Sequence, residues 1–248
     1  MQTFTTRYQR WPTQNRGDLF PSINFVLEVD SAAPGRILAK HSSFLTISAL
    51  KKIRGGSTLN IGAFRARHET GNYVFYQEAT QYWAKATSVL PFYAKNGVRS
   101  APAHGRYMYF DNPTKAGAAS ALLNSSLFYA YFISYGDCFH LSDTLAAGFP
   151  TNAEVLGDAR LAKLNTQLMA ELDSQSERKT ITSRRGGAID RIEYDEYQGS
   201  RCKSTIDKID SRLTQLYGLS DEEADFIVNY DIKYRMSSVD NSAEAEEG

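Results

Sequence analysis

Alternating apolar and polar positions predict β-strands in the first part of the chain. Between residues 23 and 29 the apolar side chains Ile23, Phe25, Leu27 and Val29 alternate with mostly polar ones, as in a strand with one buried face. Further β signals lie at residues 37–47, 73–77 and 106–110. Gly- or Pro-containing pairs predict turns between these segments, at residues 34–35, 55–56, 71–72 and 96–97.

One long helix is predicted at residues 114–135. Leu123, Leu127 and Tyr131 recur at four-residue spacing, and Phe128 widens the apolar stripe. A stripe this wide needs partners on several sides, so we expect this segment to be the core helix of its domain. The polar Asn-Ser-Ser at residues 124–126 is expected to cap or to form internal hydrogen bonds.

After residue 150 the pattern becomes helical. Leucines at helical spacing predict a helix over residues 153–173, and a polar stretch follows at 174–204, with a turn candidate at 184–187. Isoleucines and leucines then mark a helix face from residue 206 to 216, which Gly218 can end in a left-handed cap. Ser220 with Glu223 predicts a capping box that opens the next helix.

These elements predict an α+β fold. We expect a mixed β-sheet domain with one core helix at residues 1–150, a helical C-terminal region at 151–236, and an acidic flexible tail at 237–248. The chain shows no internal repeat.

Composition places the chain among globular proteins. Its 248 residues, 42% of them hydrophobic, can bury a sizeable core without staples. Cys138 and Cys202 form neither a disulfide framework nor a zinc-ligand cluster, which favours a reducing compartment. The first twenty residues lack a signal pattern, and polar residues interrupt the most apolar run, 116–133. We therefore expect a cytoplasmic protein with no membrane segment.

The formal net charge of zero hides two oppositely charged halves. Residues 1–115 carry 15 Lys and Arg against 6 Asp and Glu, and residues 116–248 carry 13 against 22. Basic charge concentrated on one region is what binding to a polyanion such as nucleic acid requires. A solvated basic face beside an acidic one, with the two faces apart or docked on each other, explains the same numbers.

Motifs for autonomous catalysis are weak. No Gly-rich cofactor loop is present, and the dipeptide Asn112-Pro113 lacks the context of a base-flipping nucleophile loop. Asp225 and the segment 231–233 resemble a metal-nuclease pattern at too short a spacing. Cys138 and His140 could form a nucleophile–base pair, although residues this close in sequence at a helix end rarely have the geometry for it. The acidic segment 193–196 could supply an acid/base pair, yet a solvated loop is the ordinary interpretation. We assign no catalytic residue, metal ligand or cofactor to this chain.

The region between residues 64 and 110 combines aromatic and basic side chains. Such a mixture suits phosphate contacts together with stacking or contacts to base edges. The alternative is an aromatic β core with cations on its outer face. The loop at residues 95–100 favours the binding interpretation, because its amides, cations and hydroxyls can face a phosphate backbone. The candidate DNA-binding residues are Arg65, Arg67, Lys85, Lys95, Arg99, His104 and Arg106.

Three groups of motifs, in order, resemble the C-terminal part of type IIG-like restriction-modification enzymes and adenine-N6 DNA methyltransferases, including relatives in phage defence. The first is YWAKA at 82–86 with LPF at 90–92. The second is LLNSSLFY at 122–129 with DCFHLS at 137–142 and FP at 149–150. The third is KSTIDKID at 203–210 with YGLSDEE at 217–223 and DFIVNYDIKYRM at 225–236. Together they span about residues 80–236.

The resemblance implies that residues 1–150 are a target-recognition domain, followed by the C-terminal helices of such an enzyme. In the family this domain grips double-stranded DNA, while a separate methyltransferase domain methylates adenine with S-adenosylmethionine. That domain is missing here, so the cofactor is expected in a partner domain or subunit. Thr205 also stands where the family usually has proline.

Three hypotheses follow from the sequence. The first is a DNA-binding specificity module without catalytic activity of its own. The second is one subunit of a split S-adenosylmethionine-dependent DNA methyltransferase, for which the acidic, helical second half would be the docking surface. The third is a structural or interaction protein without affinity for DNA, whose oppositely charged halves serve self-association.

Overall fold

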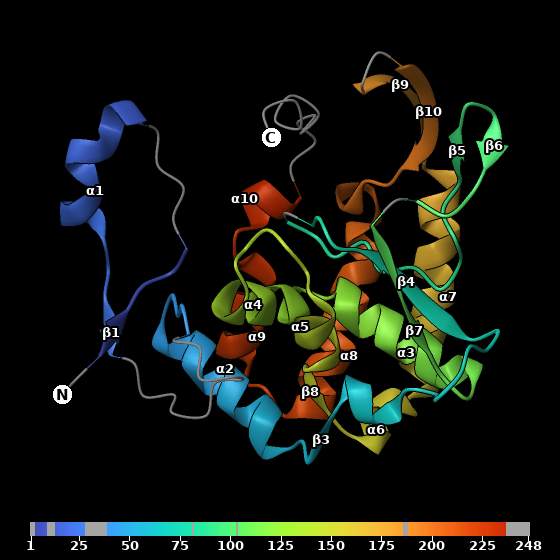
Figure 1. The fold of residues 1–248 in the computed structure, drawn as a ribbon. Helices are drawn as coiled ribbons and strands as arrows, with labels where there is room; N and C mark the ends of the chain where they lie inside the picture. Colours follow the sequence, from blue (N-terminus) through green and yellow to red (C-terminus); the bar gives the residue numbers. More distant parts are fainter. Residues whose placement is uncertain are drawn as a thin grey trace.

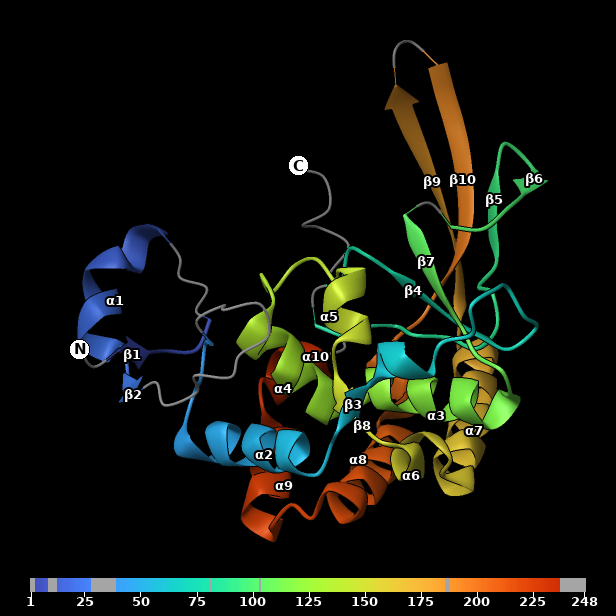
Figure 2. The ribbon, with the colours of Figure 1, turned by 60° about the horizontal axis from the view of Figure 1, so that its bottom comes forward.

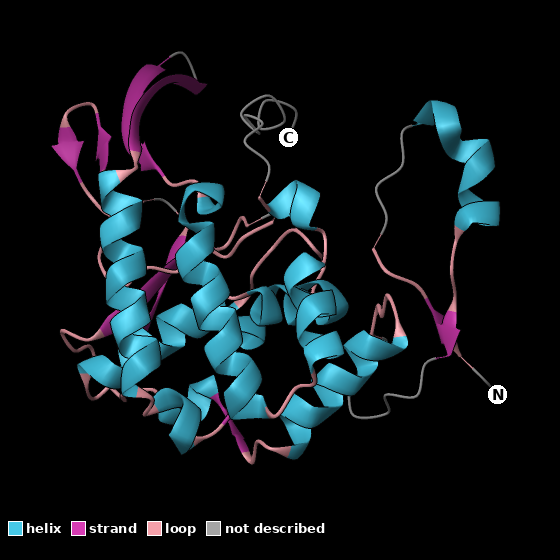
Figure 3. Cartoon of the chain, turned by 180° about the vertical axis from the view of Figure 1, so that it is seen from behind, coloured by secondary structure: helices cyan, strands magenta, loops and turns pink. Residues whose placement is uncertain are grey.

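The N-terminal segment forms an arm beside the body of the molecule. The computed structural model describes residues 3–8, 13–27, 39–80, 82–102, 104–185 and 188–236 (Figure 1). In the arm, β1 (Phe4–Thr5) pairs with β2 (Val26–Leu27), and α1 (Arg16–Ser22) lies between them in sequence, after the short 3-10 helix Thr13–Asn15. The ribbon views show α1 apart from the main group of helices (Figures 1 and 3). Only Val26–Leu27 of the strand predicted at 23–29 is a strand, and residues 28 and 29 lie outside the described residues.

Part of the strand predicted at residues 37–47 is instead the start of a helix, so that prediction was wrong. Ser43 accepts a hydrogen bond from the amide of Thr46 and begins α2 (Phe44–Gly55). The helix buries Ile47, Leu50 and Ile53, which lie three residues apart. A short apolar run is compatible with the two-residue period of a strand and with the 3.6-residue period of a helix, and here the Ser43 cap favours the helix. Residues 37 and 38 of the predicted strand lie outside the described residues.

The long helix predicted at 114–135 is two helices. Asn112 caps α3 (Pro113–Asn124), and α4 (Ser126–Tyr135) follows at an angle of 65°. Ser125 has an extended backbone at the break, where its Oγ donates to the carbonyl of Leu122 and accepts from the amide of Phe128. Every residue of α4 is buried, so the prediction that this segment forms the core is confirmed.

The polar side chains at this break bind three other segments. Asn124 accepts from the amide of Ala86 at 3.1 Å and donates to its carbonyl at 2.6 Å. Ser126 donates its amide and its hydroxyl to the two carboxylate oxygens of Asp210, at 2.8 and 2.5 Å. Arg235 donates to the Ser126 hydroxyl at 2.8 Å. The predicted internal hydrogen bonding of residues 124–126 is thereby confirmed.

Small antiparallel sheets surround these helices. The strands predicted near 73–77 and 106–110 are confirmed as β4 (Tyr73–Gln77) and β7 (Gly105–Tyr109), which pair with each other. A second pair joins β3 (Leu59–Asn60), which leads into the short 3-10 helix Ile61–Phe64, to β8 (Pro150–Thr151). Strand β4 packs on α3. The chain therefore has an α+β fold.

Residues 174–204 were predicted to be a polar stretch, but most of them form a β-hairpin. Strands β9 (Glu177–Arg185) and β10 (Ala188–Glu196) pair along their whole length, and β10 also pairs with β5 (Tyr93–Lys95), the partner of β6 (Val98–Arg99). The sheet order is β6-β5-β10-β9, so β9 is an edge strand. Figure 2 shows the hairpin projecting from the body. The sheet takes its strands from both sides of residue 150.

The second half supplies most of the remaining helices, and its predicted caps are confirmed. Gly218 ends α8 in the left-handed conformation at φ 63°, and Ser220 with Glu223 forms the capping box of α9. Helix α7 crosses α3 where Gly117 approaches Ala162 so closely that a Cβ on Gly117 would lie 3.1 Å from the Ala162 Cα. The elements are α5 (Asp143–Ala147), α6 (Ala153–Leu156), α7 (Ala159–Ser174), the 3-10 helix Gly199–Cys202, α8 (Lys203–Tyr217), α9 (Asp221–Asn229) and α10 (Ile232–Arg235).

None of the described helices is by itself both long and apolar enough to cross a bilayer. The bent pair α3–α4 reaches that length and hydropathy only when its two halves are taken together.

Titration of the buried Asp210 should make stability depend on pH. Burial raises the pKa of Asp210 to about 6, which means that the folded state favours the neutral form of this carboxyl group. This contribution is complete below the ordinary aspartate pKa and is lost as pH rises through the folded-state value. Between about pH 4 and about pH 7.5 the wild type should therefore lose about 2–3 kcal/mol of unfolding free energy relative to Asp210→Asn.

Urea unfolding of both proteins across this range measures the difference. Asp221→Asn, at an exposed position on α9, is the control and should keep the wild-type profile over this range. Parallel profiles for the wild type and Asp210→Asn would contradict the prediction.

Candidate nucleic-acid interface

Arg65 is held inside the body of the protein. Its guanidinium donates to both oxygens of Asp143, at 2.9 and 2.6 Å, and the hydroxyl of Tyr76 donates to the same carboxylate at 3.0 Å. The Arg65 side chain is only 25% exposed. A bidentate pair of this kind fixes the guanidinium, so Arg65 braces α5 against β4 and is poorly placed to reach a phosphate.

Arg106 is also paired, whereas three other candidates on the body are exposed. Arg106 Nε donates to Glu78 Oε1 at 2.7 Å, although half of its side chain remains in contact with solvent. Arg67, Lys85 and His104 are exposed, and the last two have left-handed backbone conformations at φ 50° and 57°. Burial among neighbouring atoms lowers the pKa of the Lys85 amine, and the Glu196 carboxylate opposes this effect.

Lys95 and Arg99 lie on the projecting sheet. Asn96 and Gly97, both at positive φ, form the turn between β5 and β6 that the Asn-Gly pair predicted. Lys95 Nζ lies 2.6 Å from Asp190 Oδ2 across the sheet, and Asn96 binds the amide of Arg191. These contacts fasten the β5–β6 turn to the hairpin.

Sequence reasoning missed the cations of the hairpin itself. Directly opposed residues of antiparallel strands share a face of the sheet, and side chains alternate along each strand. The register therefore puts four arginines on one side of the sheet, which we call the arginine face. It consists of Arg99, Arg178, Arg184 and Arg191, together with Thr180, Thr182, Ile189, Glu193 and Asp195.

The arginine face is accessible and carries excess positive charge. Arg178 and Arg191 are 50% and 64% exposed, and they pair within the sheet with Asp195 at 2.5 Å and Glu193 at 3.0 Å. The Phe92 ring lies 3.5 Å from the Arg178 guanidinium and 5.1 Å from that of Arg99. The face thus carries four arginines and only two carboxylates. The Phe92 ring and the two carboxylates orient guanidinium groups while leaving them in contact with solvent.

The candidate enzyme groups have other partners. The Cys138 thiol is buried and donates to the carbonyl of Ile133, whereas His140 is exposed and its Nδ1 lies 2.8 Å from Asp137. Asp231 accepts from Tyr129, and no cluster of three metal-ligating side chains occurs among the described residues.

No protein-family model matches the chain, and neither a curated protein nor a solved structure matches it.

The pair Arg65–Asp143 should contribute to stability. The hydrogen bonds from Arg65 lower the pKa of Asp143, so the pair stabilises the fold above the ordinary aspartate pKa of 3.8 and loses this effect as pH falls further. At about pH 7 Asp143→Asn should lower the unfolding free energy by about 1 kcal/mol, and the loss should be smaller near pH 3.

Urea unfolding at both pH values measures this effect. Asp111→Asn, which removes the 60% exposed partner of Lys115, is the control and should cost less. A loss for Asp143→Asn that is equal at both pH values would contradict the prediction.

Proposed function

We propose that the chain is a DNA-binding target-recognition module that contacts double-stranded DNA through the arginine face. The observation that carries this proposal is the gathering of four accessible guanidinium groups on one side of a projecting sheet. Guanidinium groups bind phosphate oxygens in forked geometry, and their binding releases the counterions condensed on the duplex. The threonine hydroxyls between them add donors for the same backbone.

The shape of the hairpin supports the same function. A two-stranded β-ribbon is narrow enough to enter the major groove of a duplex, where side chains can reach base edges. The β9–β10 hairpin projects from the body and is widened at one edge by β5 (Figure 2). In this proposal Arg99 acts within the arginine face, whereas Lys95, which the register places on the other face beside Asp190, secures the β5–β6 turn. The solvent-facing Arg67, Lys85, His104 and Arg106 provide weaker contacts around the base of the sheet.

The proposed module acts together with another polypeptide segment. The motif resemblance favours a restriction-modification or adenine-N6 methyltransferase system, in which a methyltransferase domain or subunit binds S-adenosylmethionine. Outside the β9–β10 hairpin, residues 116–248 carry 17 acidic against 8 basic residues, which favours docking of a protein there over contact with DNA.

Duplex affinity measured against salt concentration tests the proposal. A fluorescent duplex of about 30 base pairs should bind the wild type with a negative slope of log affinity against log salt. The double variant Arg184→Gln/Arg191→Gln should bind about tenfold or more weakly, and its slope should be shallower by about 2, because two phosphate contacts are lost.

Arg160→Gln/Lys208→Gln removes the same charge from exposed positions on α7 and α8 and is the matched control. This control should keep both the affinity and the slope of the wild type. A wild-type affinity independent of salt, or equal losses in the two double variants, would overturn the proposal.

A further inference from the structure

Tyrosines gather on one face of the β4–β7 pair. The register places Tyr73 opposite Tyr109, and Phe75 opposite Tyr107, so these four rings share a face of the sheet. The Tyr107 and Tyr109 rings are parallel, with centroids 5.8 Å apart, and Tyr73 meets the Tyr107 ring edge-on at 5.5 Å. The three tyrosines, which we call the tyrosine ladder, are only partly buried. They present aromatic surface that the described structure does not fully cover.

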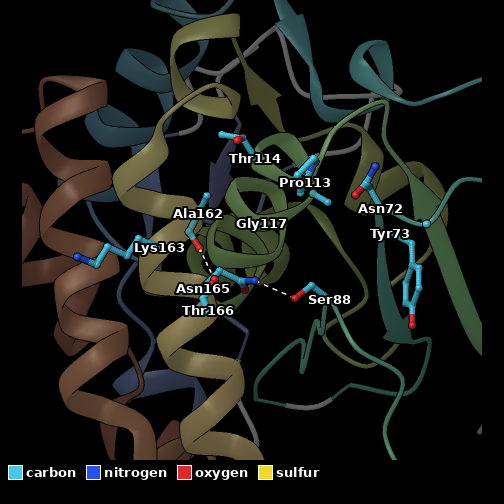
Figure 4. Close-up of a pocket in the computed structure, with 12 residues that line it drawn as sticks. Asn72, Tyr73, Ser88, Pro113, Thr114, Gly117, Ala162, Lys163, Asn165 and Thr166 are labelled. Carbon is cyan, nitrogen blue, oxygen red and sulfur yellow. Dashed lines mark hydrogen bonds between the residues drawn. The ribbon is translucent and has the colours of Figure 1, made fainter.

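A polar cavity adjoins this ladder. Its volume is about 350 Å³, and it lies between β4, the first turn of α3 and the middle of α7 (Figure 4). Tyr73 belongs to both the ladder and the cavity lining. The polar groups of the lining come from Asn72, Ser88, Thr114, Lys163, Asn165 and Thr166. In Figure 4 the Lys163 amine points away from the cavity, which leaves mainly amide and hydroxyl groups around it.

Asn165 gives this cavity an unused hydrogen-bond acceptor. Only 2% of the residue is exposed, and its Nδ2 donates to Ser88 Oγ at 3.0 Å. Its Oδ1 accepts no hydrogen bond from any described group. A buried amide oxygen without a partner destabilises the fold, so a ligand donor that reached this oxygen on binding would gain the full interaction.

We infer that the tyrosine ladder and the cavity bind an unpaired nucleotide of a nucleic-acid strand. Aromatic faces stack on any nucleobase, and the cavity volume falls in the range that holds a small ligand. Base amino and imino groups are hydrogen-bond donors that match the free Asn165 oxygen. Paired bases keep these donors and faces inside the duplex, so the ligand is unpaired.

A cation stands close to the ladder. The amide of Ala66 donates to the carbonyl of Tyr109 at 2.8 Å, which places the exposed Arg67 next in sequence to a residue anchored on the ladder strand. A guanidinium there can bind the phosphate of a stacked nucleotide. This site is separate from the arginine face and does not require duplex binding.

Photo-crosslinking of the unmodified protein tests the site directly. A ten-nucleotide oligothymidine with one 5-iodo-2′-deoxyuridine, and the matching oligouridine with 5-iodouridine, serve as probes. We expect crosslinks in the peptides that contain Tyr73, Tyr107 or Tyr109, found by mass spectrometry. Crosslinks confined to other peptides, or no binding of either probe, would overturn the inference. The stronger of the two probes identifies DNA or RNA as the source of the nucleotide.

Variants test stacking separately from folding. Tyr107→Ala should weaken single-strand binding about five- to a hundredfold, whereas Tyr107→Phe should retain it, because the ring stacks and the hydroxyl does not. Tyr234→Ala, which removes a 44% exposed stacked ring on α10, is the control and should bind like the wild type. Single-strand affinity unchanged in Tyr107→Ala would contradict stacking on the ladder.

Duplex affinity of Tyr107→Ala distinguishes the two proposals. We expect it to equal that of the wild type, since the arginine face is intact. Loss of duplex binding in the arginine variants with single-strand binding preserved would support both sites. Absence of duplex binding in the wild type would contradict only the arginine face, and absence of single-strand binding would contradict only the tyrosine ladder.

Discussion

The hydrogen bonds made at the break between α3 and α4 hold the rest of the structure in place. Apolar burial alone does not select one register for a helix pair, because the hydrophobic effect is not directional. Asn124 supplies a directional contact by binding both backbone groups of Ala86, and Ser126 supplies another by binding Asp210 on α8. These bonds therefore fix the positions of the α3–α4 break, the segment at Ala86 and α8 relative to one another. The segment ending at residue 86 leads directly toward β5, so the same bonds help to fix the base of the projecting sheet.

Local signals made part of this fold predictable. Gly218 and the pair Ser220–Glu223 define helix ends through their own conformations and hydrogen bonds, so their sequence patterns survive any tertiary context. The α3–α4 break was harder to predict, since the apolar residues Leu123 and Leu127 keep helical spacing across Ser125. Its capping role shows only in the extended backbone that the surrounding core imposes.

The β9–β10 hairpin escaped prediction for a physical reason. Alternation of apolar and polar residues reports burial of one face, but both faces of the outer hairpin meet solvent, and even Ile181 and Ile189 are 46% and 62% exposed. The partners of the candidate cations could not be predicted for a related reason. Sequence shows where positive charge lies, not which carboxylate it meets, and Asp143 stands 78 residues from Arg65. Spacing along the chain therefore grouped Arg65 with Arg99, although their environments differ.

The position of β9 at the edge of its sheet has a consequence for solubility. Every second residue of this nine-residue strand directs its backbone amide and carbonyl away from β10, and these groups form a template on which a strand of another chain can add. Charged side chains at Arg178, Lys179 and Arg184 oppose such growth by mutual repulsion between molecules. The positive charge of this strand thus opposes edge-to-edge association between molecules, and neutralisation of β9 would remove that protection.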